Sequence, residues 1–261
     1  MNDRCAEENR FQGRPLRGSA FAGVLLRELR GYLITPVAWL FTVIFLLLAG
    51  ALTFYLGGFF ERGQADLQPF FQFHPWLYLV LVPAVAMRLW AEERRSGTLE
   101  LLLTLPIRPW QAVLAKFFAA WICVGVALAL TFPMWLTVVY LGSPDNGVIL
   151  AGYVGSLLLA GAFLAIGECV SALTRSQVIA FILTVAICFL LLMAGYPLVQ
   201  GPLQALGWPA LANGLSDLSL YVHFNAISRG VLDLRDMAYF ILTIAFWLTA
   251  CVIVLDTKRG I

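Results

Sequence analysis

The stretch WAEERRSGTLELLLTLPIRPW, residues 90–110, decides how the rest of the chain is arranged. It carries too many charges to cross a bilayer, yet long apolar segments lie on both sides of it. We therefore interpret it as a connection between two membrane spans. The Ser96-Gly97 pair predicts the end of a first helix, and the two later prolines predict the end of a second helix and the start of a third.

The short helix predicted for residues 98–105 is more apolar than a helix surrounded by water should be. It contains five leucines, and Glu100 is its single charged residue. About eight helical residues form a rod of roughly 12 Å. Two interpretations fit this surface: a partner protein covers it, or it lies among lipid headgroups against its own bundle. The composition of the segment does not choose between them.

Residues 92–106, EERRSGTLELLLTLP, with MRLW before them, resemble the signature loop of type 2 ABC (ATP-binding cassette) permeases. The resemblance is closest to the branch named after gliding-motility permeases, and it extends from residues 27–30 to the last apolar segment. It implies the permease subunit of an exporter that is driven by separate ATPase subunits, which bind ATP and Mg. On this basis we assign contact with the ATPase to Glu92, Glu93, Gly97, Thr98, Glu100, Leu101, Leu102 and Pro106.

The composition of the chain is that of an integral membrane protein. Of its 261 residues, 61% are hydrophobic and 12% are charged, whereas soluble domains are roughly half apolar and about a quarter charged. A span needs roughly 20 apolar residues, and we expect an all-α fold with a tail at residues 1–20 and one permease domain at residues 21–261. The six predicted spans are Leu33–Gly58, Phe71–Leu89, Phe117–Leu141, Val148–Leu173, Val178–Gly195 and Met237–Leu255.

Charge and amphipathic patterns predict the orientation and the shorter helices. Basic residues gather near both ends of the chain and in residues 88–116, so the positive-inside rule places both termini in the cytoplasm, and the resemblance implies a bacterial inner membrane. Residues 21–30 predict an amphipathic helix on the inner membrane surface, although a helix packed only on its own protein would give the same pattern. Residues 196–236 predict short helices that dip into the outer leaflet and cover the outer end of the bundle.

The fourth predicted span contains a small-residue face and a carboxylate. Small residues recur every four positions at Gly152, Ser156 and Ala160, so another helix can approach this face closely. We interpret this face as a helix-packing contact. Glu168 is the one acid inside a predicted span, and an intramembrane carboxylate is a functional hypothesis by default. Its place near the cytoplasmic end also fits a structural role, in which it faces water, pairs with Arg175 or hydrogen-bonds to the inner loop. We favour the structural role.

The sequence offers no residues with which this chain would catalyse a reaction. A P-loop needs a lysine directly after a glycine, but the two lysines of the chain follow Ala115 and Thr257, so we expect ATP hydrolysis in a partner subunit. The five cysteines form no Cys-x-x-Cys pair, and we expect neither a metal nor a cofactor in this chain. An intramembrane protease is the less favoured alternative, because the two histidines, His74 and His223, both lie near the predicted outer surface.

We expect the protein to export a substrate that the sequence does not identify. Six helices of one chain fill their own bundle, so a path is easier to build between two permease chains, identical or different. The expected partners are the ATPase subunits, this second permease chain and membrane lipid, with an extracytoplasmic auxiliary subunit as a further candidate and no nucleic acid. The alternative is a membrane anchor or mechanical component of an envelope or motility complex, which uses the ATPase cycle without moving a solute.

Overall fold

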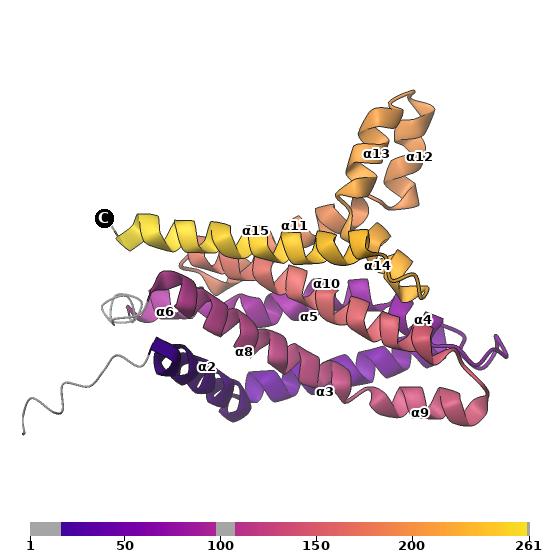
Figure 1. The fold of residues 1–261 in the computed structure, drawn as a ribbon, viewed down its shortest axis with the longest axis horizontal. Helices are drawn as coiled ribbons and strands as arrows, with labels where there is room; N and C mark the ends of the chain where they lie inside the picture. Colours follow the sequence, from indigo (N-terminus) through magenta and orange to yellow (C-terminus); the bar gives the residue numbers. More distant parts are fainter. Residues whose placement is uncertain (1–16, 98–107, 260–261) are drawn as a thin grey trace, which may run out of the picture.

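The computed structural model describes residues 17–97 and 108–259. Within these ranges every regular element is a helix, and the long helices lie side by side along one axis (Figure 1). We call the end of this bundle that carries α6 (Arg88–Ser96) the loop end, and the opposite end, with α4 (Gln68–Gln72), the hairpin end. The remaining elements are α2 (Arg17–Ile34), α3 (Pro36–Ala51), the π-helix η1 (Leu52–Leu56), α5 (His74–Ala86), α8 (Pro109–Ala129), α9 (Phe132–Leu141), α10 (Asn146–Leu173), α11 (Gln177–Met193), α12 (Pro197–Ala205), α13 (Pro209–Asp217), α14 (Leu220–Ser228) and α15 (Leu234–Arg259).

Several of these helices are long and apolar enough to cross a membrane. Four segments of the described chain qualify individually, and a fifth qualifies if α11 and α12, which meet at a bend of 55°, count as one span. The four are Ala38–Leu56, Pro109–Leu141, Asn146–Leu173 and Leu234–Thr257. The protein is therefore a multi-pass, all-helical membrane protein, whereas the predicted number of six spans is not confirmed.

The second predicted span, Phe71–Leu89, is divided between three helices. The chain leaves α4 at Phe73, forms α5, and starts α6 at Arg88. The 13 residues of α5 extend only about 20 Å, short of the roughly 30 Å hydrocarbon core. Most of α5 is buried, because α3, α8, α10 and α11 pack around it. Its apolar side chains thus face the protein interior, which hydropathy does not distinguish from lipid.

Helix α10 forms the centre of the bundle. It contacts α5, α6, α8, α11, α14 and α15, and nearly all of its residues from Leu159 onward are buried. Glycines allow these close contacts: a Cβ at Gly152 would collide with the ring of Phe71, and one at Gly167 would collide with the Cβ of Ala86. The sequence of α10 therefore suits a helix that is surrounded by protein on most of its faces.

The N-terminal helix α2 is longer than the segment predicted from its amphipathic pattern. It packs against α8 at the loop end, with Val24 buried. On its other faces Leu26, Leu33 and Ile34 are exposed. One side of α2 is therefore held by the protein, and its placement on the membrane surface stays a prediction.

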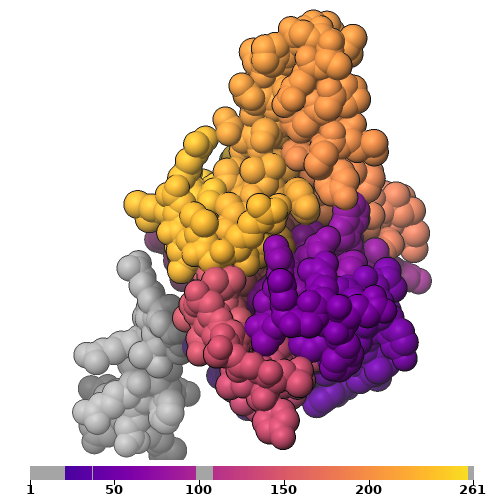
Figure 2. Space-filling model, turned by 90° about the vertical axis from the view of Figure 1, so that its right-hand side faces the viewer, coloured from indigo at the N-terminus to yellow at the C-terminus, as the bar shows by residue number. Residues whose placement is uncertain are grey.

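Residues 196–236 contain three short helices, α12, α13 and α14, and they do not all pack on the end of the bundle. Helix α14 packs on α10 and α15, and much of it is buried. Helices α12 and α13 instead project sideways from the hairpin end, as Figures 1 and 2 show. No residue of α12 is buried, and only Ala212 of α13 is. The prediction that this whole region covers the bundle of its own chain is therefore wrong for α12 and α13, which pack mainly on each other.

Candidate functional site

The two helices that flank residues 98–107 have well-defined ends. Helix α6 ends at Ser96, as predicted, because Gly97 adopts a left-handed conformation with φ 72° that glycine accepts without strain. Two arginines in its last turn interact favourably with the negative end of the helix dipole. Helix α8 begins at Pro109, also as predicted, and the backbone N–H of Arg108 donates to the side-chain oxygen of Gln111 at 3.2 Å. The described chain thus stops at a well-defined helix end before residues 98–107 and resumes at a well-defined helix start after them.

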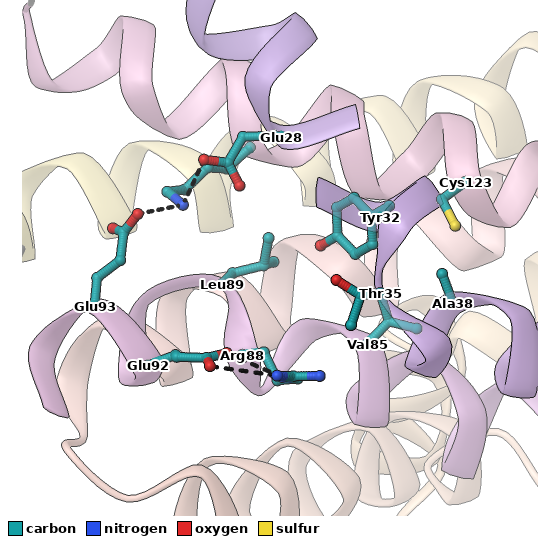
Figure 3. Close-up of a pocket in the computed structure, with 11 residues that line it drawn as sticks. Glu28, Tyr32, Thr35, Ala38, Val85, Arg88, Leu89, Glu92, Glu93 and Cys123 are labelled. Carbon is teal, nitrogen blue, oxygen red and sulfur yellow. Dashed lines mark hydrogen bonds and ion pairs between the residues drawn. The ribbon is translucent and has the colours of Figure 1, made fainter. Parts of the chain in front are cut away.

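A buried lysine joins three helices at the loop end. The side chain of Lys116, on α8, is only 3% exposed, and its Nζ lies 2.8 Å from Glu93 Oε1 on α6 and 3.2 Å from Glu28 Oε1 on α2. In Figure 3 both carboxylates point at the same amino group. Arg27 approaches the same two acids, at 2.7 Å from Glu28 and 3.7 Å from Glu93. We call Arg27, Glu28, Glu93 and Lys116 the lysine cluster.

The charges of the lysine cluster stabilise one another. Burial acts to raise the pKa of Glu28, but the attraction of Lys116 and hydrogen bonds from Arg27 and Lys116 outweigh burial, so this pKa lies below its ordinary value of 4.5. Glu28 is therefore ionised at neutral pH. Lys116 also lies 5.2 Å from the ring centroid of Trp90, within the range of a cation–π interaction. A buried ammonium group is tolerated only when it is paired in this way.

Trp90 and its neighbours bind α6 to the C-terminal half of α10. The fully buried indole of Trp90 donates from Nε1 to Glu168 Oε1 at 3.0 Å. Ser171 Oγ accepts from the backbone N–H groups of Trp90 and Ala91 at 3.1 and 3.0 Å and donates to Met87 O at 3.0 Å. These bonds satisfy amide groups that the first turn of a helix leaves without partners. The break between α5 and α6 is thereby held against α10.

A further hydrogen bond extends this attachment toward the end of α6. Arg94 Nη1 donates to Ala172 O at 2.8 Å. Helix α6 therefore contacts α10 along its length, while its opposite side holds Lys116 through Glu93. The lysine cluster and the contacts of Trp90 together connect α2, α6, α8 and α10.

Glu168 lies where the sequence placed it, near the loop end of its span, and its partner matches one of the predicted alternatives, a hydrogen bond to the inner loop. It is fully buried, so it does not face water, and it accepts from Trp90 instead of pairing with the exposed Arg175. Its second oxygen, Oε2, has no hydrogen-bond partner among the described residues. The bond to Trp90 at the start of the inner connection agrees with the structural alternative, and a functional role of this carboxylate stays untested.

A cavity of about 290 Å³ opens beside the lysine cluster, between α2, α3, α5, α6 and α8 (Figure 3). Its polar wall contains Glu28, Lys116 and the pair formed by Arg88 and Glu92, whose Nε and Oε2 lie 3.0 Å apart. Its apolar wall includes Val85 and Leu89. Among the described residues, no three His, Cys, Asp or Glu side chains are grouped as a metal site. The ion pairs along its polar wall connect α2, α6 and α8.

The structure places the predicted site residues in two separate regions. Glu92 and Glu93 lie at the loop end, each in an ion pair, and Gly97 ends α6. Five of the predicted ATPase contacts lie outside the described residues, namely Thr98, Glu100, Leu101, Leu102 and Pro106. The small-residue face of Gly152, Ser156 and Ala160 is buried in the other half of α10.

Sequence reasoning missed three of the four members of the lysine cluster. Arg27 and Glu28 lie in the segment for which only an amphipathic helix is predicted, and Lys116 enters the predictions only as a basic residue of the stretch 88–116. Lys116 nevertheless follows Pro109 by seven positions in an apolar helix of 21 residues. A lone lysine in such a helix is a signal for a buried acidic partner.

Comparison with known proteins agrees with this architecture. Residues 23–255 match the model of a family described as "ABC-2 family transporter protein". A search of curated proteins found no match. The family match supports type 2 ABC permeases as a group, and it does not support the gliding-motility branch within them.

Proposed function

Since this chain belongs to the ABC-2 transporter family and is a membrane permease component of an ABC transporter, we propose that it forms the path of an exporter as a dimer. In this proposal separate ATPase subunits bind ATP and Mg and act on residues 98–106. The loop end and both termini face the cytoplasm, as the distribution of basic residues predicts, and the membrane is a bacterial inner membrane, as the resemblance implies.

The observation that carries this proposal is the way both flanks of residues 98–107 are held. Lys116, close to the start of α8, is bound to Glu93 of α6, so the helices that enter and leave the segment are tied together. The same contacts reach α2 through Glu28 and α10 through Trp90. A displacement of the segment by a bound ATPase would therefore move four helices as one unit.

The resemblance favours a protein partner for the segment, and the sequence of the segment is compatible with one. Its leucines suit an apolar cleft, and Glu100 suits a basic group within that cleft. Such a charge-assisted hydrogen bond contributes on the order of 1.5 to 3 kcal/mol. Leucine burial would add roughly 1.5 to 3 kcal/mol for each side chain that is fully covered.

The packing of the bundle supports a path between two permease chains. Side chains of α5 and α10 fill the centre of one chain, and the residues of α10 from Leu159 to Ala172 are almost all buried. By contrast, α3 and α15 expose large apolar side chains, which a second chain or lipid can cover. An opening between two copies therefore disturbs less packing than an opening within one copy.

The test is co-purification of ATPase subunits with an affinity-tagged permease. Glu100→Arg and Leu102→Asp should each weaken ATPase binding by about tenfold or more, which corresponds to about 1.4 kcal/mol. Asp256→Arg is the matched control, because Asp256 is an exposed acid near the C-terminal end of α15. If the Glu100 and Leu102 variants bind the ATPase as wild type does, residues 98–106 are not the contact.

A further inference from the structure

The hairpin end contains a polar cavity that plays no part in ATPase contact. Its volume is about 230 Å³, and it lies between α14 and the region of α4. These segments meet on the face shown in Figure 2, where α4 and the chain before it are purple and the region of α14 and α15 is orange to yellow. The cavity is lined by Arg62, Gln68, Gln72, Tyr221, Phe224, Asn225, Ser228 and Arg229.

Two guanidinium groups line this cavity without an acid to neutralise them. Among the residues that the structure describes, neither Arg62 nor Arg229 forms an ion pair, and no Asp or Glu contributes to the lining. Arg235, at the same end of the bundle, instead pairs with Asp217 at 3.2 Å. A bound anion would neutralise the two positive charges that line this cavity.

The other side chains of the lining add hydrogen-bond donors. Gln68 and Gln72 on α4 and Asn225 on α14 carry amide N–H groups. Burial raises the pKa of Tyr221, and Tyr196 adds to this effect, whereas the charge of Arg229 opposes it. Tyr221 therefore keeps its O–H as a donor at neutral pH. Donors from two helices thus surround the two arginines.

The neighbouring cavity limits the length of an anion that fits. It measures about 220 Å³ and shares Gln68, Ser228 and Arg229 with the first cavity, but it adds Asp66 and Asp145. A long polyanion that extended past Arg229 would meet these acids. The first cavity is also smaller than the roughly 300 to 1,000 Å³ of pockets that enclose drug-sized ligands. The space suits one compact anionic group.

We propose that Arg62 and Arg229 bind one phosphate group, carried by an anionic phospholipid or present as free inorganic phosphate. Guanidinium groups bind phosphate oxygens through paired N–H donors, and the donors of α4 and α14 complete the site. The cavity lies at the hairpin end of the bundle, whose long helices are apolar enough to cross a membrane. The site goes beyond the proposed ATPase coupling and does not depend on it.

The test uses the full chain purified in detergent and has two arms. Native mass spectrometry measures anionic phospholipid that stays bound, and calorimetric titration measures binding of inorganic phosphate. Wild type should bind in at least one arm, and Arg62→Gln and Arg229→Gln should each lower that affinity by about tenfold or more. Both arginines are exposed, so circular dichroism should show both variants folded.

Arg235→Gln is the matched control, because it removes a nearby arginine that is already paired with an acid. Binding of lipid without binding of phosphate identifies a lipid headgroup site, whereas binding of phosphate identifies a site for the phosphate group itself. The proposal is overturned if wild type binds in neither arm. It is equally overturned if Arg235→Gln loses as much affinity as the two lining variants.

Discussion

Replacement of Lys116 by Met tests how strongly the lysine cluster holds the loop end together. Methionine is one atom shorter than lysine and keeps most of its apolar stem, but it removes the charge. The variant leaves Glu28 and Glu93 facing each other without the ammonium group that both of them contact at 3.2 and 2.8 Å. Only Arg27 then remains near the two carboxylates.

The structure sets the expected magnitude of this change. Removal of one partner from a fully buried ion pair costs roughly 3 to 5 kcal/mol. Lys116 is 3% exposed, but the side chains of Glu28 and Glu93 are 17% and 19% exposed, so water can partly solvate the acids that are left. We therefore expect Lys116→Met to lower the free energy of unfolding by about 2 to 4 kcal/mol.

The assay is reversible unfolding of the purified protein by SDS in mixed micelles, followed by circular dichroism. The triple variant Glu28→Gln, Glu93→Gln, Lys116→Met should recover at least half of the lost free energy, because replacing all members of a buried charged group is often close to neutral. A loss below about 0.5 kcal/mol in the single variant, which is the scale of an ordinary surface substitution, would refute the reasoning. So would a triple variant that is less stable than the single one.

Three other predictions concern pH, packing and topology. The pKa of Glu28 is lowered, so the ionised carboxylate stabilises the folded protein above about pH 4.5, and this stabilisation is lost as the pH falls further. The melting temperature of the Glu28→Gln variant should therefore change less than that of wild type between about pH 7 and about pH 4. Gly167→Ala should lower the melting temperature, because the added Cβ would collide with Ala86. A Cβ at Gly50 on α3 would contact no other atom, so Gly50→Ala should raise the melting temperature slightly. Equal effects of the two substitutions would contradict this packing. In intact cells an impermeant thiol reagent should not label Cys5, whereas it should label the cysteine of an Asp145→Cys variant. Labelling of Cys5 from outside would show that the predicted orientation is wrong.

The features that sequence alone predicted correctly depend on local chemistry. Gly97 ends α6 and Pro109 starts α8 because glycine accepts a left-handed conformation and proline suits the first turn of a helix. The apolar composition likewise predicted an all-helical membrane protein. These signals act within a few residues or average over the whole chain, so they do not require knowledge of how helices pack.

The features that the sequence did not determine depend on packing between distant segments. Hydropathy assigned Phe71–Leu89 to one span, which is not confirmed, because its central helix α5 has only 13 residues and is mostly buried in the protein. The sequence left the partner of Glu168 open between water, Arg175 and the inner loop, and the observed donor is Trp90 of that loop, 78 residues away. The meeting of Glu28 with Lys116 likewise follows from the packing of α2 on α8.

The most direct test of the account is to measure ATPase binding and ATP hydrolysis together in the purified permease–ATPase complex. The triple variant Glu28→Gln, Glu93→Gln, Lys116→Met should still bind the ATPase, because residues 98–106 are unchanged. Its stimulated hydrolysis should nevertheless fall by about fivefold or more, the low end of ordinary coupling free energies, because α6 and α8 no longer move with α2. Full stimulated hydrolysis without the lysine cluster would contradict the claim that these contacts carry the motion.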